Sequence, residues 1–178
     1  LFGELQIPVA ALGPVHALGR KAQFFRVIGH HPVVDQMAEV AVDTETGVVR
    51  MVKMVAVQDI GLVVDRLTAR SQVAGALIMG IASALTEERI MDNKTGRFIN
   101  ADLANYKLPR IGDIGEFVIE FYEPESEYQR GVIGLGEPPA ISPMAAISNA
   151  VANAIGVRVP VLPLTPQRVL EALKGAQA

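Results

Sequence analysis

The sequence has no cysteine and no tryptophan, and aromatic residues make up only 5% of its 178 positions. Without cysteine the chain cannot form disulfides or thiolate zinc sites, and it cannot ligate an iron–sulfur cluster. Neither sign of charge dominates, because the net charge is −3 and the pI is about 5.6. The sequence therefore offers no broad basic surface, which argues against binding to nucleic acids or to anionic membranes.

The chain also lacks a long uninterrupted hydrophobic run. Its longest apolar stretch, residues 140–164, is broken by prolines, asparagines and an arginine, so we expect no membrane span. The sequence shows no signal-peptide pattern, and we therefore expect a cytoplasmic protein. The first residue is Leu1 rather than methionine, which suggests a fragment or a processed piece.

Half of the residues are hydrophobic, and a chain of 178 residues can bury a sizeable core. This size predicts a single domain that covers residues 1–178. Residues 1–22 are rich in glycine, proline and alanine and show little periodicity, so we expect an irregular lead-in there.

Strands are predicted where β-branched residues alternate with polar ones. Residues 37–43 and 48–58 show this alternation on both sides of the sequence DTETG. Such a pattern predicts a β-hairpin that turns at Gly47. A further strand is predicted over residues 116–123.

A long helix is predicted over residues 67–87. Apolar residues recur four apart along this segment, and Asp65 precedes it as the expected N-cap. Gly75 and Gly80 lower the helix propensity of the segment, so we expect it to pack closely against another backbone.

A second helix is predicted over residues 143–155. Ser142 followed by Pro143 is a typical start, and Gly156 supplies the end. This helix is apolar on nearly all sides, which indicates that it is buried. The same start and end signals predict a short terminal helix over residues 166–174. The fold class is therefore α+β, with a β-hairpin sheet, a long helix, a buried helix after the Gly-x-Gly-Glu loop and a short C-terminal helix.

Glu137 stands out in the loop before the buried helix. It follows Gly134 and Gly136 and precedes Pro138 and Pro139. The glycines can adopt positive φ, and the following proline favours an extended conformation for the glutamate. A carboxylate with so few backbone alternatives is suited to act as a general base.

Other interpretations of the conspicuous polar residues remain open at this point. Glu137 could simply complement the dipole of the helix that follows it. A phosphate-binding loop is disfavoured, because Pro138 and Pro139 lack the N–H groups that such a loop uses as donors. His30 and His31 could bind a metal, but adjacent histidines without a third ligand nearby are more often an ordinary loop pair.

Three segments of the sequence resemble one known family. They are AEVAVDTETGVVRMVKMVAVQDIG (38–61), LTARSQVAGALIMGIASALTEE with NADLANYKLP (67–88 and 100–109), and GLGEPPAISPMAAISNAVANAIGVRVPVLPLTPQRVLEAL (134–173). Together they are similar to the C-terminal part of the molybdenum-cofactor (molybdopterin)-binding subunit of the xanthine dehydrogenase and aldehyde oxidase family. The family's order and spacing are kept over about three quarters of the chain.

The resemblance implies an oxidoreductase that hydroxylates an aldehyde or an N-heterocycle with oxygen derived from water. Glu137 matches the family's catalytic glutamate, the general base that takes the proton from Mo–OH. Gln72 matches a glutamine that contacts the cofactor, and Arg70, Ser71 and Gly136 are expected to bind the cofactor beside it. No residue of this chain is expected to ligate the metal.

The resemblance also implies cofactors and partners. The cofactor would be molybdenum-molybdopterin, in its cytosine dinucleotide form, with iron–sulfur clusters and FAD on other domains or subunits. The expected partners are the remaining part of the molybdopterin-binding subunit, these electron-transfer subunits and a small-molecule substrate. The complex would be cytoplasmic, with the periplasm as the alternative. We expect the isolated chain to be inactive; the alternative function is a non-catalytic assembly module or a cofactor-free remnant of the fold.

Overall fold

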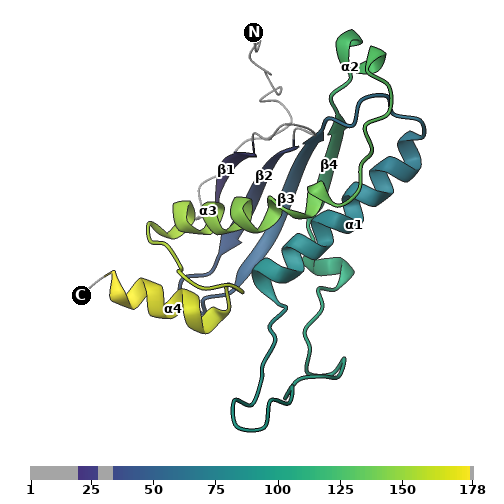
Figure 1. The fold of residues 1–178 in the computed structure, drawn as a ribbon. Coiled ribbons are helices and arrows are strands. Elements are labelled where there is room, and N and C mark those ends of the chain that lie inside the picture. The colour runs from purple at the N-terminus through teal and green to yellow at the C-terminus, as the bar shows by residue number, and fades with distance from the viewer. Residues whose placement is uncertain (1–19, 28–33, 177–178) are drawn as a thin grey trace.

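The computed structural model of this chain describes residues 20–27 and 34–176. Its four-stranded sheet has the order β1-β2-β3-β4, and its two longest helices lie against one face of the sheet (Figure 1). The strands are β1 (Arg20–Val27), β2 (Val34–Val42), β3 (Val49–Gln58) and β4 (Glu116–Phe121). The described helices are α1 (Arg66–Leu85), α2 (Glu125–Gln129), α3 (Pro143–Ile155) and α4 (Pro166–Gly175), with short 3-10 turns η2 (Ile111–Asp113) and η3 (Pro138–Ala140). The predicted α+β fold is confirmed.

The sheet is mixed. β1, β2 and β3 are successively antiparallel, whereas β4 lies parallel to β3. Parallel neighbours need a long crossover, which α1 and the segment after it supply. The expected irregular lead-in is wrong at its end, because residues 20–22 already belong to β1; residues 1–19 lie outside the described part of the chain. Residues 20–22 are part of a strand because they pair with β2. The alternation of apolar and polar residues in the sequence does not reveal that pairing.

The turn between β2 and β3 forms where the sequence predicts it. Gly47 has a φ of 74°, which favours glycine. The Oδ1 atom of Asp43 accepts hydrogen bonds from the N–H groups of Glu45 and Thr46, at 2.9 and 3.2 Å. A Cβ atom at position 47 would lie only 2.3 Å from the carbonyl oxygen of Pro166, so the hairpin turn packs closely against the start of α4.

The core lies between the sheet and helices α1 and α3. β2 and β3 contribute the buried residues Ala38, Val40, Met51, Met54 and Ala56. The helices contribute Val73, Leu77, Ile81, Ala146, Ile147, Ala150 and Val151. The prediction that the helix over residues 143–155 is buried is confirmed for one face of α3. That face consists of Pro143, Ala146, Ile147, Ala150 and Val151. No helix among the described residues is both long and apolar enough to cross a membrane.

Only one of the two glycines of α1 lies at a close helix contact. A Cβ atom at Gly80 would lie 2.4 Å from the Cβ atom of Pro143, the first residue of α3. Gly75 has no neighbour within 4 Å of such an atom and is exposed. Close packing is therefore found at Gly80, although the neighbour is the ring of Pro143 rather than a backbone. The prediction is wrong for Gly75, because Gly75 lies on another side of the helix.

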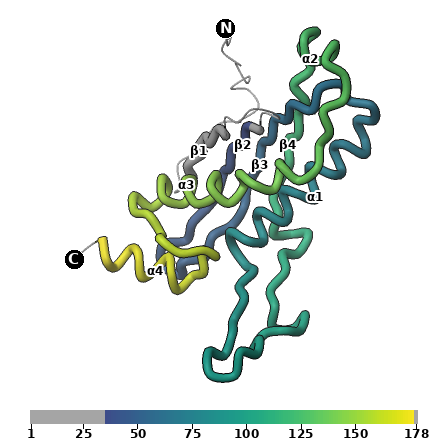
Figure 2. The backbone as a smooth tube through the Cα atoms, viewed as in Figure 1, coloured from purple at the N-terminus to yellow at the C-terminus, as the bar shows by residue number. Residues whose placement is uncertain are grey.

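Residues 86–110 form a long excursion between α1 and η2, which we call the arm. Figure 2 shows the arm extending well beyond the end of the sheet before the chain returns to β4. Met91 and Phe98 pair across it in an isolated antiparallel bridge. The turn between them is closed by a hydrogen bond from the N–H of Gly96 to the carbonyl oxygen of Asp92, at 2.8 Å.

Candidate functional site

Glu137 lies between two glycines with positive φ and the turn η3. The φ angles of Gly134 and Gly136 are 97° and 50°, as the sequence predicts. Glu137 itself has φ −109° and ψ 2°, so the expected extended conformation is wrong. Its carbonyl oxygen accepts a hydrogen bond from the N–H of Ala140 at 2.9 Å, and closing this turn outweighs the preference imposed by the following proline. The resulting bridge conformation is sparsely populated in general but recurs among active-site residues.

Gln72 reaches this loop from the second turn of α1. Its Nε2 atom donates a hydrogen bond to the carbonyl oxygen of Gly136 at 3.3 Å. The start of α1 is fixed by Asp65, the predicted N-cap, whose Oδ1 atom accepts from the N–H of Thr68 at 2.9 Å. This bond from the Thr68 backbone lowers the pKa of Asp65, and the nearby Thr68 hydroxyl lowers it further. The hydroxyl itself donates to the main-chain carbonyl oxygen of Asp65 at 3.3 Å. The structure thus brings together Gln72, Gly136 and Glu137, which the resemblance assigned to one site.

A groove of about 430 Å³ opens beside this contact, between the start of α1 and the segment that leads to Glu137. Its walls are mostly apolar, and the side chains of Asp65, Thr68 and Gln72 add polar atoms. The lining residues are Ile60, Leu62, Val64, Asp65, Thr68, Ala69, Gln72, Val132, Gly134 and Leu135. The groove therefore offers an apolar wall with a carboxamide at one edge, next to the glycine-rich loop.

The carboxylate of Glu137 is exposed and caps neither η3 nor α3. Within the described part of the chain it accepts no side-chain hydrogen bond, so it is available to a group outside this chain. Arg70 and Ser71 are also exposed on α1, two residues and one residue before Gln72. Neither lines the groove, and their expected contact with a cofactor stays a prediction.

Two buried amides near the site were not singled out from the sequence. Gln36 in β2 and Gln58 at the end of β3 are both 0% exposed. They occupy the same alternating positions as the core residues Ala38 and Ala56, so both face the helices. A glutamine at a core-facing position of a strand is the signal that could have identified them, because buried amides are uncommon without a partner.

The structure gives no cluster of candidate metal ligands in its described ranges, 20–27 and 34–176. No group of three or more histidine, aspartate or glutamate side chains there could hold an ion. His30 and His31 lie outside the described residues, so their interpretation as a loop pair stays a prediction.

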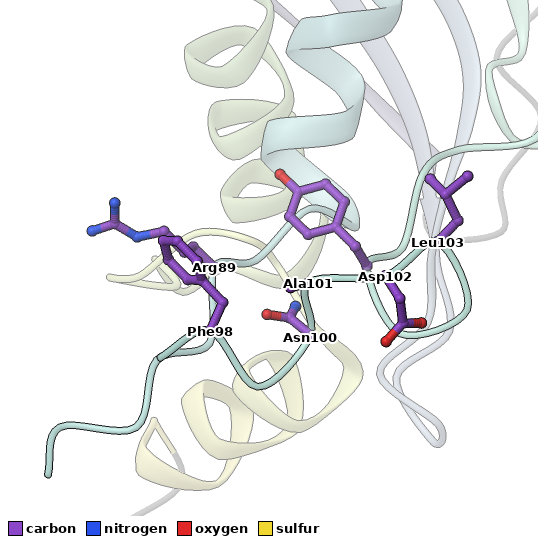
Figure 3. Close-up of a pocket in the computed structure, with 7 residues that line it drawn as sticks. Arg89, Phe98, Asn100, Ala101, Asp102 and Leu103 are labelled. Atoms are coloured by element: carbon purple, nitrogen blue, oxygen red, sulfur yellow. The ribbon is translucent and has the colours of Figure 1, made fainter. Parts of the chain in front are cut away.

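A second pocket, of about 420 Å³, lies in the arm and shares no lining residue with the groove beside Gln72 (Figure 3). Its lining residues are Arg89, Phe98, Asn100, Ala101, Asp102, Leu103 and Tyr106. The guanidinium of Arg89 stacks over the Phe98 ring, 5.5 Å from its centroid. Asn100 holds the two sides of the arm together, since its amide donates to the Glu88 carbonyl at 2.6 Å and accepts from the Ile90 N–H at 3.0 Å. The arm is thus internally braced although much of its apolar surface is exposed.

Comparison with known proteins places this geometry in a family. A family model described as a molybdopterin cofactor-binding domain matches residues 21–115, more than half of the chain. The aldehyde oxidoreductase molybdenum-binding subunit PaoC of Escherichia coli is 41% identical over 138 residues, which cover 76% of this chain and 19% of that protein.

Two solved structures share the fold. The aldehyde oxidoreductase of Desulfovibrio gigas matches with a TM-score of 0.70 and 36% identity, over 80% of this chain and 15% of that one. The quinoline 2-oxidoreductase of Pseudomonas putida matches with a TM-score of 0.73 and 28% identity, over 80% of this chain and 19% of that one. This chain therefore spans less than a fifth of the length of these relatives. It belongs to the molybdopterin cofactor-binding domain family, and it corresponds to part of the molybdenum-binding subunit of the xanthine dehydrogenase and aldehyde oxidoreductase enzymes.

Proposed function

We propose that this chain forms one wall of the active site of a molybdenum hydroxylase that oxidises an aldehyde or an N-heterocycle, with Glu137 as the general base. The observation that carries the proposal is the hydrogen bond from Gln72 to the Gly136 carbonyl. It joins two segments that lie 64 residues apart and sets an exposed carboxylate next to the groove. The names of the relatives support the substrate class, since they include an aldehyde oxidoreductase and a quinoline oxidoreductase.

The polar groups of the site suit a cofactor whose metal is held by the cofactor itself and not by protein side chains. No cluster of metal-binding side chains lies among the described residues. Gln72 instead offers a carboxamide, which can both donate to and accept from a pterin. Gly134 has no side chain and has open space around its Cβ position, so a ligand can approach the backbone there. Molybdenum-molybdopterin, when bound, supplies the centre that accepts two electrons from the substrate.

Glu137 would accept the proton that a water-derived oxygen nucleophile loses as it bonds to the electron-poor carbon of the substrate. Its exposed carboxylate has no competing partner within the described residues. The apolar groove walls would exclude bulk water when the rest of the site covers them. A positioned general base of this kind typically contributes about 10²–10⁴-fold to the rate.

The remaining parts of the enzyme would supply what this chain lacks. No cysteine is present, so iron–sulfur clusters would sit on other domains or subunits, as would FAD. The cytosine dinucleotide form of the cofactor is proposed on the same family grounds. Because the relatives are more than five times longer than the matched segment, the remainder of the molybdenum-binding subunit would cover the exposed surfaces of this chain.

The experiment that tests the function measures molybdenum content and turnover of the complete enzyme with a panel of aldehydes and N-heterocycles. We expect molybdenum near one atom per subunit and oxidation of at least one substrate class. A properly folded enzyme complex without molybdenum would instead support the alternative, a non-catalytic assembly module.

Replacing Gln72 with alanine should lower molybdenum occupancy or turnover several-fold in the complete enzyme, because a carboxamide at the groove edge is lost. Metal analysis and steady-state rates check this. Gln129→Ala is the matched control: Gln129 is also an exposed helical glutamine, and its side chain donates to Glu125 within α2, away from the groove. Unchanged metal content and rate in Gln72→Ala would remove Gln72 from the site.

The arm should mediate self-association when the 178-residue chain is produced alone. Exposed apolar residues cluster along it, and large patches of this kind normally mark interfaces. They are Ile90, Met91, Phe98, Ile99, Leu103 and Leu108. In sedimentation velocity, we expect oligomers that become smaller when Ile99 and Leu103 are changed to serine. The control Val161→Ser alters an exposed apolar residue outside the arm. A monomer at micromolar concentration would contradict the prediction.

A further inference from the structure

Two glutamine side chains hold the backbone on either side of Glu137. Gln72 donates to the carbonyl oxygen of Gly136, the residue before the glutamate. Gln36, in β2, donates from Nε2 to the carbonyl oxygen of Pro139, two residues after it, at 2.7 Å. The contact from Gln36 spans 103 residues of sequence and is fully buried, whereas the one from Gln72 is longer, at 3.3 Å, and exposed. The loop is therefore anchored to α1 on one side and to the sheet on the other.

The prolines explain why carbonyl groups serve as the anchoring points. Pro138 and Pro139 have no N–H, so this part of the loop cannot donate hydrogen bonds to its surroundings. Its carbonyls remain available, and they need donors. Gln36 supplies such a donor from the core, and Pro139 is itself buried against this part of the structure. The bond fixes the turn η3, whose first carbonyl acceptor is Glu137.

An amide at position 36 is not required by packing. Gln36 is 0% exposed, and the next core-facing residues of β2, Ala38 and Val40, are apolar. Its Oε1 atom has no hydrogen-bond partner among the described residues, so only the Nε2 atom is satisfied, by the Pro139 carbonyl. Burying an amide has a free-energy cost that only a hydrogen bond offsets, and an apolar side chain of similar size would avoid that cost. The bond to the Pro139 carbonyl is thus the feature of Gln36 that an apolar residue could not reproduce.

We propose that Gln36 is a positioning residue for the reaction: by holding the Pro139 carbonyl it fixes the turn that aims the Glu137 carboxylate. This inference rests on the proposed role of Glu137 as general base. It predicts that the loss of one buried hydrogen bond, remote from the substrate, lowers the rate of the chemical step while substrate binding and cofactor content stay the same. Small displacements of a catalytic group can reduce rates by about 10²-fold.

Gln58 provides a matched control for this inference. It is also 0% exposed, on the neighbouring strand β3, and it faces the same side of the sheet as Gln36. Neither of its amide atoms has a hydrogen-bond partner among the described residues, and it makes no bond to the Glu137 loop. Changing either glutamine to methionine removes a buried amide and keeps a similar volume, but only one change releases the loop.

The test compares Gln36→Met, Gln58→Met and Glu137→Gln in the complete enzyme. For Gln36→Met we expect kcat to fall by about 10–100-fold, with KM and molybdenum content close to wild type. The melting temperature should fall slightly, because the buried Pro139 carbonyl loses its donor. Gln58→Met should leave kcat and KM unchanged. If Gln36→Met does not fold, Gln36→Asn keeps the buried amide but is one methylene too short to reach the carbonyl, and the same loss of kcat is expected.

The outcomes separate the two proposals. Unchanged kcat in a folded Gln36 variant, with turnover lost in Glu137→Gln, overturns the positioning role and leaves the general base intact. An equal fall of kcat in Gln58→Met also overturns it, because the effect would then come from core packing. Full turnover in Glu137→Gln would instead overturn the proposed function itself.

Discussion

Turnover of the complete enzyme should fall by at least about 10²-fold when Glu137 is replaced with glutamine, which corresponds to about 2.7 kcal/mol at 1.36 kcal/mol per decade. Glutamine keeps the shape and most of the hydrogen-bonding capacity of the side chain but cannot accept the proton. The Glu137 side chain is exposed and caps no helix, so the fold should hardly change. Steady-state rates, molybdenum content and melting temperature should be measured on the same preparation.

The three measurements on Glu137→Gln distinguish a base from a structural charge. For a general base, turnover falls while molybdenum content and melting temperature stay near wild type. For a carboxylate that only complements the dipole of α3, stability falls by about 0.3–1 kcal/mol and turnover is nearly unchanged. Glu120→Gln, an exposed glutamate in β4, is a control for the loss of one surface charge. Full activity with a lowered melting temperature would contradict the catalytic role.

Replacing Gly80 with alanine should destabilise the fold relative to the same change at Gly75, by about 1–3 kcal/mol. Both substitutions gain the same helix propensity, so the difference between them isolates packing. At position 80 the new Cβ atom would lie 2.4 Å from Pro143, whereas at position 75 it would meet nothing within 4 Å. Urea unfolding of the 178-residue chain, followed by circular dichroism, measures both.

The Gly80 comparison also bears on the site, because Pro143 begins α3 shortly after the Glu137 turn. A displaced α3 would disturb the turn η3, so turnover of the complete enzyme should fall for Gly80→Ala and not for Gly75→Ala. Gly75→Ala by itself should stabilise the chain by about 0.5–1 kcal/mol. Equal stability of the two variants would mean that α1 and α3 do not approach as closely as the structure indicates.

Much of the fold followed from local sequence signals. The hairpin was predictable because a glycine, Gly47, stands between two segments of alternating residues. In the structure this glycine has the positive φ that such a turn requires. The helix limits were predictable where side chains or glycine satisfy the free backbone groups, as Asp65 does at the start of α1 and Gly156 at the end of α3. Ser142 begins α3 as predicted, but its side chain makes no capping bond. β1 was missed because only its pairing with β2 makes it a strand.

The sequence by itself determined that Glu137 sits in a constrained loop, since the glycines before it and the prolines after it restrict the backbone whatever surrounds them. Only the tertiary structure decided the rest of the site. The pre-proline preference for an extended Glu137 gave way to a turn whose closing bond forms only once η3 is in place against the sheet and α1. Gln72 and Gln36 reach the loop from 64 and 103 residues away, and no local pattern specifies such distances. The periodicity of apolar residues shows which side of a strand or helix is buried. Which carbonyl group each glutamine side chain binds depends on how the sheet and helices pack.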